Sequence, residues 1–286
     1  MIFKVARAEL HNWEEPVISG EKGSGTVFFC GCSMRCVFCQ NYNISRSTQN
    51  GLSLTDKELL NVFCSLEQEG ALNINLVTPS HYAKPLRNVL LKFKKISNLP
   101  IVYNTNAYES VENLKLLDGL VDIYLPDLKY VSSELSFSFS GRKDYFEKAY
   151  PAILEMQRQQ PENIIEDGIM KKGVIVRHLV LPNCTDDSKE VLDALCRMPQ
   201  KPLVSIMSQY FPTESVQNHP TLNRKISIRE YEKVTDYANV LGFDGFTQDL
   251  KSATMDYTPS FDLSILEKRL NGIKIKKTEN EMHPKS

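Results

Sequence analysis

Short apolar segments alternate with capped amphipathic segments along most of this 286-residue chain. β-branched and aromatic residues fill the apolar segments and turn residues end them, which is typical of β-strands. Most of these segments carry no polar residue on either face, as expected of strands buried in a parallel sheet. The expected strands are residues 26–30, 74–77, 101–103, 121–125, 174–180 and 203–207.

Helix start signals lie between the expected strands. Thr55 and Glu58 form a capping-box pattern ahead of an apolar helical face, and Ser227 repeats the pattern with a glutamate three residues later. Asp187 has the same spacing to a glutamate, so a third helix is expected to be capped there. The other helices are expected over residues 84–96, 110–117 and 144–160, and residues 160–172 are expected to form a loop.

Strand followed by helix, repeated six times, predicts right-handed βα units and therefore an α/β fold with a parallel sheet. A partial (β/α)6 TIM-like barrel and a doubly wound sheet both fit, and both place the ligand site at the carboxyl ends of the strands. We expect an N-terminal segment (1–24), the barrel (25–250) and a C-terminal extension (251–286) whose polar end is frayed.

Charge balance and the chain start limit the expected partners. The 34 Lys+Arg are matched by 35 Asp+Glu, so neither nucleic acid nor an anionic membrane is an expected partner. No run of about 18 apolar residues occurs, and the polar start does not suit a signal peptide, so we expect a cytoplasmic protein. Thiols stay reduced in that compartment, and seven cysteines are therefore expected to bind metal, to catalyse or to pack.

Three cysteines lie on a short segment directly after the first expected strand. Cys32, Cys36 and Cys39 have the spacing C-x-x-x-C-x-x-C, so their thiolates can converge on one metal centre. Thiolates select zinc or iron–sulfur clusters. A structural zinc needs a fourth ligand, for which Cys30 or His81 is the candidate, whereas a 4Fe-4S cluster with three cysteines leaves one iron open to an exogenous molecule. The scattered cysteines are interpreted as packed thiols, as is Cys30: Cys64, Cys184 and Cys196.

These motifs give the chain a resemblance to the radical S-adenosylmethionine (radical SAM) superfamily. Residues 6–45 and the stretches LVTPSHY, PDLKY, VRHLVLP and SIMSQYFP are similar to relatives of pyruvate formate-lyase-activating enzyme, and the similarity runs over about residues 6–249. The resemblance implies a partial barrel in which Cys32, Cys36 and Cys39 hold three irons of a 4Fe-4S cluster. S-adenosylmethionine (SAM) is then implied to chelate the fourth iron through its amine and carboxylate.

The resemblance also implies contacts to SAM. Phe38 matches the aromatic residue that lies against the adenine, and Thr78 and Ser80 occupy the place of a Gly-Gly-Glu-like turn that binds the methionyl amine. Asp127 and Lys129 match an Asp-Leu-Lys triplet that approaches SAM. Without the resemblance, Asp127 and Lys129 would equally fit a surface ion pair at a strand end.

Further positions are implied to face the same pocket. Asn104, with Thr105, aligns with an Asp-Thr pair that helps to bind a monovalent cation, although asparagine lacks the charge of the aspartate. Arg177 matches an arginine facing SAM, and its planar fork suits a carboxylate. The weaker candidates for the substrate side are His178 and Gln209, while the tyrosines on or near strands are interpreted as packing residues: Tyr103, Tyr108 and Tyr124.

By resemblance, the function is expected to be reductive cleavage of SAM to a 5′-deoxyadenosyl radical that abstracts hydrogen, as in activases of glycyl radical enzymes. The implied partners are a glycyl radical enzyme or another protein or peptide, and an electron donor of the flavodoxin or ferredoxin type. Residues 40–53 are too few for a ferredoxin-like insert, so one cluster is expected. The alternatives are a radical SAM enzyme that modifies a small molecule or peptide, and a thiolate metal-binding or redox module without turnover.

Overall fold

The protein is described here by a computed structural model that covers residues 1–249 and 261–282. Its strands form a ten-stranded sheet with the order β10-β9-β8-β6-β5-β4-β2-β1-β3, and β7 pairs with β8 beside this path. The strands are β1 (Ile2–His11), β2 (Ser24–Phe29), β3 (Leu52–Thr55), β4 (Ile74–Val77), β5 (Ile101–Thr105), β6 (Ile123–Pro126), β7 (Ile164–Glu166), β8 (Ile169–Leu179), β9 (Leu203–Met207) and β10 (Gly245–Thr247).

The sheet is a partial barrel, which confirms the expected α/β class. All neighbouring pairs from β2 through β4, β5, β6, β8 and β9 to β10 are parallel. All six expected strands are present, and β10 extends the parallel series by one more. The antiparallel strands β1 and β3 lie beyond β2, so the N-terminal segment begins with a strand of the same sheet. Within the described residues β10 and β3 form open edges, and the barrel is not closed.

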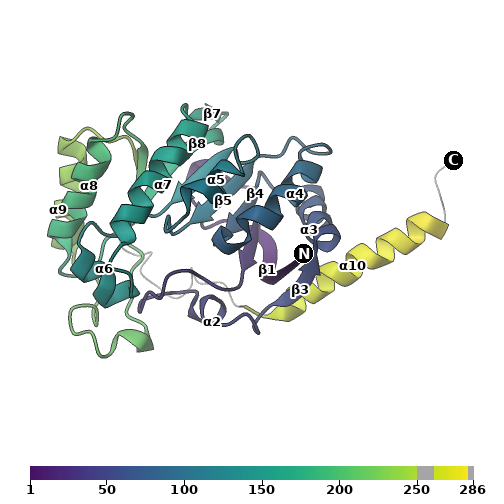
Figure 1. The fold of residues 1–286 in the computed structure, drawn as a ribbon, viewed down its shortest axis with the longest axis horizontal. Coiled ribbons are helices and arrows are strands. Elements are labelled where there is room, and N and C mark those ends of the chain that lie inside the picture. Colours follow the sequence, from purple (N-terminus) through teal and green to yellow (C-terminus); the bar gives the residue numbers. More distant parts are fainter. Residues whose placement is uncertain (250–260, 283–286) are drawn as a thin grey trace.

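Most of the longer helices pack against the outer face of the sheet, whereas the C-terminal helix extends away from the body of the molecule (Figure 1). The helices are α1 (Pro16–Ser19), α2 (Tyr42–Ser45), α3 (Asp56–Gln68), α4 (Ala83–Phe93), α5 (Val111–Lys115), α6 (Ser133–Ser140), α7 (Tyr145–Gln159), α8 (Thr185–Cys196), α9 (Ile228–Val240) and α10 (Leu263–Met282). Two short 3-10 turns are η1 (Ser80–Tyr82) and η2 (Glu214–Val216).

The capping predictions are confirmed at two of three positions. Thr55 and Ser227 each form a complete capping box with the glutamate three residues later, at the starts of α3 and α9. The prediction at Asp187 is wrong, because α8 begins two residues earlier, at Thr185. The carboxylate of Asp187 instead accepts hydrogen bonds from the backbone amides of Val131 and Ser132, which join this helix to the segment after β6.

One segment expected to be a loop is regular. Residues 160–172 hold β7 and the start of β8, an antiparallel hairpin that turns at Asp167 and Gly168, both with positive φ. The isoleucines of β7 and β8 are β-branched and favour the extended backbone. Helix α10 spans Leu263–Met282, and residues 283–286 lie outside the described part of the chain, so the frayed end stays a prediction.

Two apolar layers occupy the two sides of the parallel strands. Alternation along β5 places Val102 inside the barrel, whereas Ile101 and Tyr103 pack toward the helices. Ile18 of α1 belongs to the inner group, and a Cβ added at Gly20 would meet the side chains of Leu72 and Ile169 at the amino ends of β4 and β8. Helix α1 therefore fills the amino end of the barrel and leaves the carboxyl end for polar groups.

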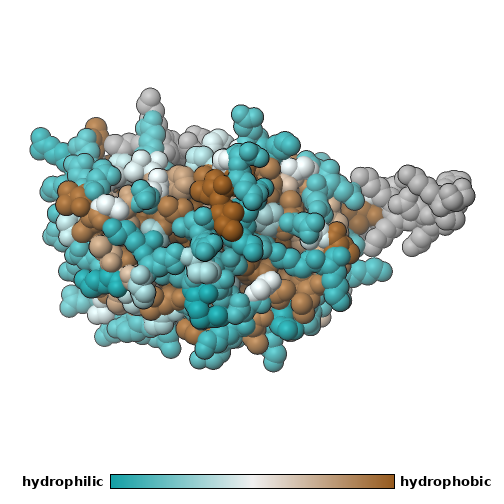
Figure 2. Space-filling view, turned by 90° about the horizontal axis from the view of Figure 1, so that it is seen from above, coloured by the Kyte–Doolittle hydropathy of each residue, from teal (hydrophilic) through white to brown (hydrophobic). Residues whose placement is uncertain are grey.

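The surface gives no sign of a membrane segment. None of the helices within residues 1–249 and 261–282 is both long enough and apolar enough to cross a bilayer. Seen from above, hydrophilic residues cover most of the visible face and apolar residues are interspersed among them (Figure 2). Such interspersed apolar residues are ordinary on protein surfaces.

Candidate active site

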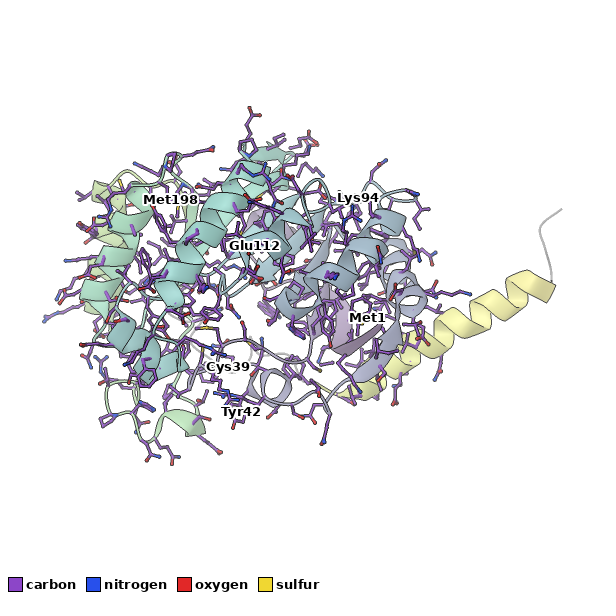
Figure 3. The ribbon with its side chains drawn as sticks, viewed as in Figure 1. Met1, Cys39, Tyr42, Lys94, Glu112 and Met198 are labelled. Atoms are coloured by element: carbon purple, nitrogen blue, oxygen red, sulfur yellow. The ribbon has the colours of Figure 1, made fainter. Side chains whose placement is uncertain are left out.

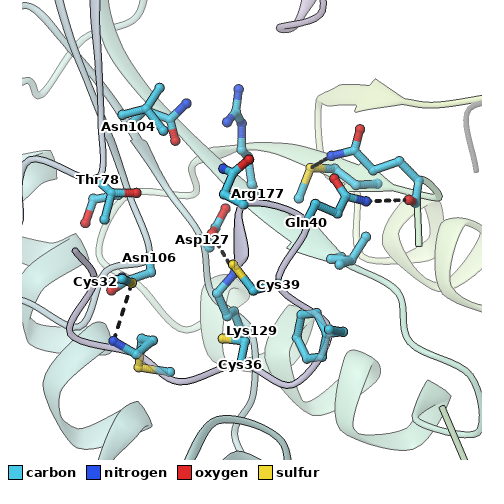
Figure 4. Close-up of a pocket in the computed structure, with 18 of the residues that line it drawn as sticks. Cys32, Cys36, Cys39, Gln40, Thr78, Asn104, Asn106, Asp127, Lys129 and Arg177 are labelled. Carbon is cyan, nitrogen blue, oxygen red and sulfur yellow. Dashed lines mark hydrogen bonds and ion pairs between the residues drawn. The ribbon is translucent and has the colours of Figure 1, made fainter. Parts of the chain in front are cut away.

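A cavity opens at the carboxyl ends of the parallel strands, and the cysteine segment forms one of its walls (Figure 4). Nine of the ten site residues taken from the sequence line this cavity, and Ser80 is the exception. The nine are Cys32, Cys36, Phe38, Cys39, Thr78, Asn104, Asp127, Lys129 and Arg177. The cysteines lie toward one end of the cavity and Asn104 and Arg177 toward the other (Figure 4).

The segment from Cys32 to Cys39, called the cysteine loop below, follows β2 without regular structure and is held by α6. The backbone amides of Arg35 and Val37 donate to the carbonyls of Ser140 and Phe139, at 3.2 and 2.8 Å. The Arg142 guanidinium donates twice to the Ser33 carbonyl, at 2.6 and 3.0 Å. The loop has no strand partner, and these hydrogen bonds hold its backbone in place. Its thiols then face the cavity.

Each of the three thiols has a polar neighbour from a different element. Asn106 Nδ2 donates to Cys32 Sγ at 3.2 Å, and Ser140 Oγ donates to Cys36 Sγ at 3.0 Å. The Cys39 thiol lies 3.4 Å from the hydroxyl of Ser45. Burial raises the pKa of Cys36 to about 11, and the ammonium of Lys129 opposes that shift. Donors and a cation around buried sulfur suit thiolates that a metal centre keeps deprotonated.

The structure separates the other cysteine and histidine candidates from this cavity. Cys30 is fully buried in a small apolar group with Ala6, Phe28 and Ile44. A ring nitrogen of His81 lies 2.9 Å from the Cys30 carbonyl oxygen, and neither residue lines the cavity. Among the described residues, no three His, Cys, Asp or Glu side chains are close enough to hold a single metal ion. Three thiols that line one cavity without converging on a point fit a cluster better than a mononuclear zinc.

Asp127 and Lys129 form a partly buried ion pair beside the cysteine loop. Lys129 Nζ donates to Asp127 Oδ2 at 2.6 Å, and the two side chains are 15% and 19% exposed. Burial disfavours the ammonium, but the Asp127 carboxylate outweighs that effect and raises the pKa of Lys129. The cavity therefore holds one ammonium and one carboxylate side by side, and such a pair of charges suits a ligand that itself carries both an amine and a carboxylate.

The turn after β4 is strained where it meets the cavity. Thr78 has φ of 57°, a left-handed conformation that is unusual for a β-branched residue and costs roughly 1–3 kcal/mol. Its backbone amide donates to the Asn104 carbonyl at 2.9 Å. Ser80 faces away from the cavity and donates to the buried carboxylate of Glu109, which also accepts from the hydroxyl of Thr105. Direct contact of Ser80 with a ligand is therefore not favoured by this geometry.

Arg177 is already engaged by two carboxylates that the sequence reasoning missed. Its guanidinium donates to Glu15 at 2.6 and 2.9 Å and also to Glu14, and all three side chains are at most 10% exposed. Burial would raise the pKa of Glu15, but the nearby Arg177 lowers it below the ordinary value. Both sides of the fork are occupied, so Arg177 holds the residues before α1 and is not free to bind a ligand carboxylate in this arrangement.

The remaining candidates divide between the two faces of the sheet. Phe38 lines the cavity and packs edge-on against Tyr210, with ring centroids 6.1 Å apart, and Gln209 also lines the cavity. His178 follows Arg177 on β8 and therefore faces the opposite way, where its ring nitrogens lie 2.8 Å from the Leu128 carbonyl and 2.9 Å from the Ser188 hydroxyl. The expectation that His178 lies on the substrate side is wrong, because strand residues alternate between faces.

Comparison with known proteins places the chain in a family. The model of the radical SAM superfamily matches residues 26–170. An uncharacterised protein of Methanocaldococcus jannaschii is 32% identical over 246 residues, which cover 82% of this chain and 67% of that protein.

Solved structures share the fold at low sequence identity. The crystal structure of Streptococcus suis SuiB bound to precursor peptide SuiA has a TM-score of 0.58 and 15% identity over 80% of this chain. This chain spans only about half of SuiB, with 50% of that protein covered. Methylornithine synthase (PylB) has a TM-score of 0.54 and 16% identity, over 87% of this chain and 81% of that protein. A family match over half of the chain, together with the cavity and its three cysteines, shows that this protein belongs to the radical SAM superfamily.

Proposed function

We propose that the protein is a radical SAM enzyme that cleaves SAM reductively and uses the resulting 5′-deoxyadenosyl radical to abstract hydrogen from a protein or peptide. When bound and reduced, a 4Fe-4S cluster supplies the electron for that cleavage. The observation that carries the proposal is that Cys32, Cys36 and Cys39 line one cavity with the ion pair of Asp127 and Lys129. Family membership implies both SAM and the cluster, and the donor set of this cavity fits them.

The protein residues have separate tasks in this proposal. Cys32, Cys36 and Cys39 hold three irons, which leaves the fourth for the ligand. The opposite charges of Asp127 and Lys129 bind the amine and carboxylate of a zwitterion by charge-assisted hydrogen bonds. The strained Thr78 presents backbone polar groups beside them, which preorganises the pocket.

The aromatic and apolar part of the cavity suits the rest of SAM. Phe38 is buried against Tyr210 at the cavity wall, where an adenine can pack against it. The cysteine loop and Glu14 both line the cavity, so a ligand that enters it displaces water from the space between them. A ligand that fills this space shields a radical generated there from solvent, and the radical reacts with the substrate held next to it.

For the substrate we favour a glycyl radical enzyme or another protein or peptide. The cysteine loop and residues 127–129 are similar to the corresponding segments in relatives of pyruvate formate-lyase-activating enzyme. This similarity supports an activase. A peptide is also supported by SuiB, which shares the fold and was solved with its precursor peptide. A small-molecule substrate is the alternative, because methylornithine synthase has the same fold.

The first experiment tests radical generation. The protein is reconstituted anaerobically with iron and sulfide, reduced with dithionite, and incubated with SAM, and the products are separated by chromatography. We expect 5′-deoxyadenosine and methionine in equal amounts. Stoichiometric zinc in the purified protein, with no SAM cleavage after reconstitution, would identify a metal-binding module instead.

A second experiment tests the substrate class. A candidate glycyl radical enzyme, taken from an adjacent reading frame where one encodes such an enzyme, is incubated with the reduced enzyme and SAM, and electron paramagnetic resonance is recorded. A glycyl radical signal that requires Cys36 is expected for an activase. SAM cleavage without any radical on the candidate protein would favour the peptide or small-molecule alternatives.

A further inference from the structure

Tyr145, the first residue of α7, is fully buried next to the candidate site but does not line the cavity. Helix α7 begins on the side of the molecule where Cys39 lies and runs toward the side where Lys94 and Met198 lie (Figure 3). Its first turn is therefore at the carboxyl ends of the parallel strands, where the helices of βα units begin. The Tyr145 hydroxyl can reach backbone groups that emerge from the sheet at this end.

The Tyr145 hydroxyl makes hydrogen bonds to the segments that follow two neighbouring strands. It lies 2.7 Å from the Asp127 carbonyl oxygen and 3.0 Å from the Asn106 carbonyl oxygen, and its one hydrogen is shared between these two acceptors. It also accepts from the backbone amide of Lys129 at 3.0 Å. Asn106 follows β5, and Asp127 and Lys129 follow β6. One hydroxyl therefore joins the carboxyl ends of both strands.

The same hydroxyl takes the place of a strand partner after β6. The amide of Leu128 donates to the Arg177 carbonyl of β8 at 2.8 Å, whereas the next amide, that of Lys129, donates to Tyr145. A backbone carbonyl or amide that loses its partner inside a protein costs free energy, so nearly all such groups are paired. Without the hydroxyl, the Asp127 carbonyl and the Lys129 amide find new partners only if the segment moves, and their side chains move with it.

Each of the three backbone partners of Tyr145 carries a side chain that lines the cavity. Asn106 Nδ2 donates to Cys32 Sγ at 3.2 Å, and Asp127 and Lys129 form the ion pair that we propose to bind the amine and carboxylate of SAM. The hydroxyl is therefore connected, through the backbone, to a group beside a cluster ligand and to two groups that face SAM.

Aromatic neighbours hold the Tyr145 ring between the same two segments. The ring lies parallel to that of Tyr108, with the centroids 6.4 Å apart and the planes inclined by 8°, and edge-on to that of Tyr130 at 5.7 Å. Tyr108 follows β5 and Tyr130 follows β6. Burial raises the pKa of Tyr145 above its ordinary value, so the hydroxyl keeps its hydrogen and remains both a donor and an acceptor.

We propose that Tyr145 is a positioning residue whose hydroxyl holds the ion pair of Asp127 and Lys129 and the side-chain amide of Asn106 in fixed places on the two strand ends. This inference rests on the proposed function, which assigns SAM to the ion pair and the cluster to the thiols. A site that is fixed before its ligand arrives binds more tightly, because fewer groups lose freedom on binding. Loss of the hydroxyl therefore weakens SAM binding and alters the surroundings of Cys32 Sγ, although Tyr145 itself lies outside the cavity.

The test variant is Tyr145→Phe, which keeps the ring and removes only the hydroxyl, and the matched control is Tyr231→Phe. The buried Tyr231 hydroxyl donates to the Ile206 carbonyl at 2.9 Å and accepts from the Gln248 amide at 2.8 Å, so it joins β9 to the segment after β10. Tyr231, Ile206 and Gln248 do not line the cavity. Both variants lose hydrogen bonds of the same kind, and their midpoints of unfolding in urea should fall by similar amounts.

The first readout is the Kd for SAM, measured by equilibrium dialysis with the reconstituted protein. Tyr145→Phe is expected to bind SAM roughly fivefold to tenfold more weakly, a change of the size that one hydrogen bond usually contributes. The second readout is the reduction potential of the cluster without SAM, which should become more negative as the Asn106 amide loses its fixed place beside Cys32 Sγ. Tyr231→Phe should match the wild type in both quantities.

A second substitution in the same chain separates positioning from a general loss of stability. Tyr145→Phe added to Lys129→Gln should weaken SAM binding by less than about twofold further, since the cation that the hydroxyl positions is already absent. Tyr145→Phe added to Asn106→Leu should leave the reduction potential where Asn106→Leu alone puts it.

A Kd or a reduction potential of Tyr145→Phe equal to that of the wild type would overturn the proposal. Effects of Tyr231→Phe as large as those of Tyr145→Phe, or full additivity of Tyr145→Phe with Lys129→Gln, would do the same. If Tyr145→Phe fails to fold while Tyr231→Phe folds, the hydroxyl has a purely structural role and the proposal is wrong. Failure of the wild type to bind SAM would count only against the proposed function.

Discussion

Strand β6 carries a lysine–aspartate ion pair at each end, and the two pairs behave differently. Asp122, just before β6, accepts from Lys94 and from the backbone amide of Ile101, which ties β6 to β5. Asp127, just after β6, accepts from Lys129, and both side chains line the cavity with the cysteines. The same residue types therefore support the sheet at its amino end and line the cavity of the proposed ligand site at its carboxyl end.

The difference follows from the direction of a parallel sheet. At the amino ends, α1 and apolar side chains fill the barrel, so polar groups there bond to backbone or to one another. At the carboxyl ends the chain must turn outward to each helix, which leaves polar groups around an open space. We therefore expect changes at the carboxyl end to alter ligands and the cluster, and changes elsewhere to alter the free energy of unfolding.

The largest effect is expected at the cysteine loop. Cys36→Ala should abolish retention of iron and sulfide after reconstitution, because two cysteines cannot anchor a 4Fe-4S cluster as three do. Cys30→Ala should keep nearly the full iron content, since the Cys30 thiol packs among Ala6, Phe28 and Ile44 and does not line the cavity. Iron and sulfide are measured per folded protein. Equal losses in the two variants would mean that Cys30 is a ligand.

Inside the barrel, Arg177 is expected to control stability. Arg177→Met leaves Glu14 and Glu15 buried without a cation, which should lower the free energy of unfolding by about 3–5 kcal/mol in urea. The deficit should shrink toward low pH, because Arg177 holds the pKa of Glu15 below its ordinary value and this contribution is lost once Glu15 is protonated. The control is Arg158→Met, whose arginine is 55% exposed and pairs with Asp118 and Glu155, where a loss of about 0–1 kcal/mol is expected. Similar losses in both variants would contradict a structural role for the buried triad.

On the outer face of β8, His178 is expected to make stability depend on pH. Burial lowers the pKa of His178 to about 4 from the ordinary 6.5. Between these two pH values the histidine is protonated in the unfolded chain and neutral in the folded chain. The neutral ring therefore stabilises the fold fully above pH 6.5, and this contribution of up to about 3 kcal/mol is lost as pH falls toward 4. Urea unfolding of wild type and His178→Gln at pH 7 and pH 4.5 isolates the histidine. Parallel losses in both proteins would show that carboxylates alone cause the acid sensitivity.

The lysines of the two ion pairs at the ends of β6, Lys94 and Lys129, test the comparison directly. Lys129→Gln should weaken SAM binding by roughly tenfold, equivalent to about 1.4 kcal/mol, because the pocket loses a cation and Asp127 is left unpaired. Lys94→Gln should leave the Kd for SAM unchanged and lower only the free energy of unfolding. Equilibrium dialysis with the reconstituted protein measures the Kd. A weaker Kd in the Lys94 variant would show that the amino end communicates with the site.

The smallest effect is expected at Asn106. Its amide donates to Cys32 Sγ, and a donor to sulfur favours the reduced cluster, which carries more negative charge. Asn106→Leu should therefore make the reduction potential more negative by an amount equivalent to about 1 kcal/mol, the usual net contribution of one hydrogen bond. The potential is measured by spectroscopic redox titration. Asn104→Leu is the control, since the Asn104 amide points to Glu14 and not to a thiol, and its potential should not move.

Local patterns account for what the sequence predicted well. The six parallel strands, two of the three capping boxes and the cysteine spacing all depend on residues within a few positions of one another. The misassigned cap at Asp187 depends instead on contacts with another segment. The missed hairpin of β7 and β8 is itself local, with Ile164 paired to Lys172, and its isoleucines were a signal that could have been read. Asp187 bonds to Val131 and Ser132, more than 50 positions earlier, and no local signal reports such a partner.

The sequence by itself determined the parallel α/β architecture and the three cysteines on one loop, because strand burial and ligand spacing depend on residues that are close together in the sequence. The tertiary structure decided which polar groups face the cavity and which are already satisfied. Arg177 meets Glu15 across 162 positions, and Asn106 meets Cys32 across 74. Such pairings depend on how the strands are ordered in the sheet, and only the folded chain brings their side chains within hydrogen-bond distance.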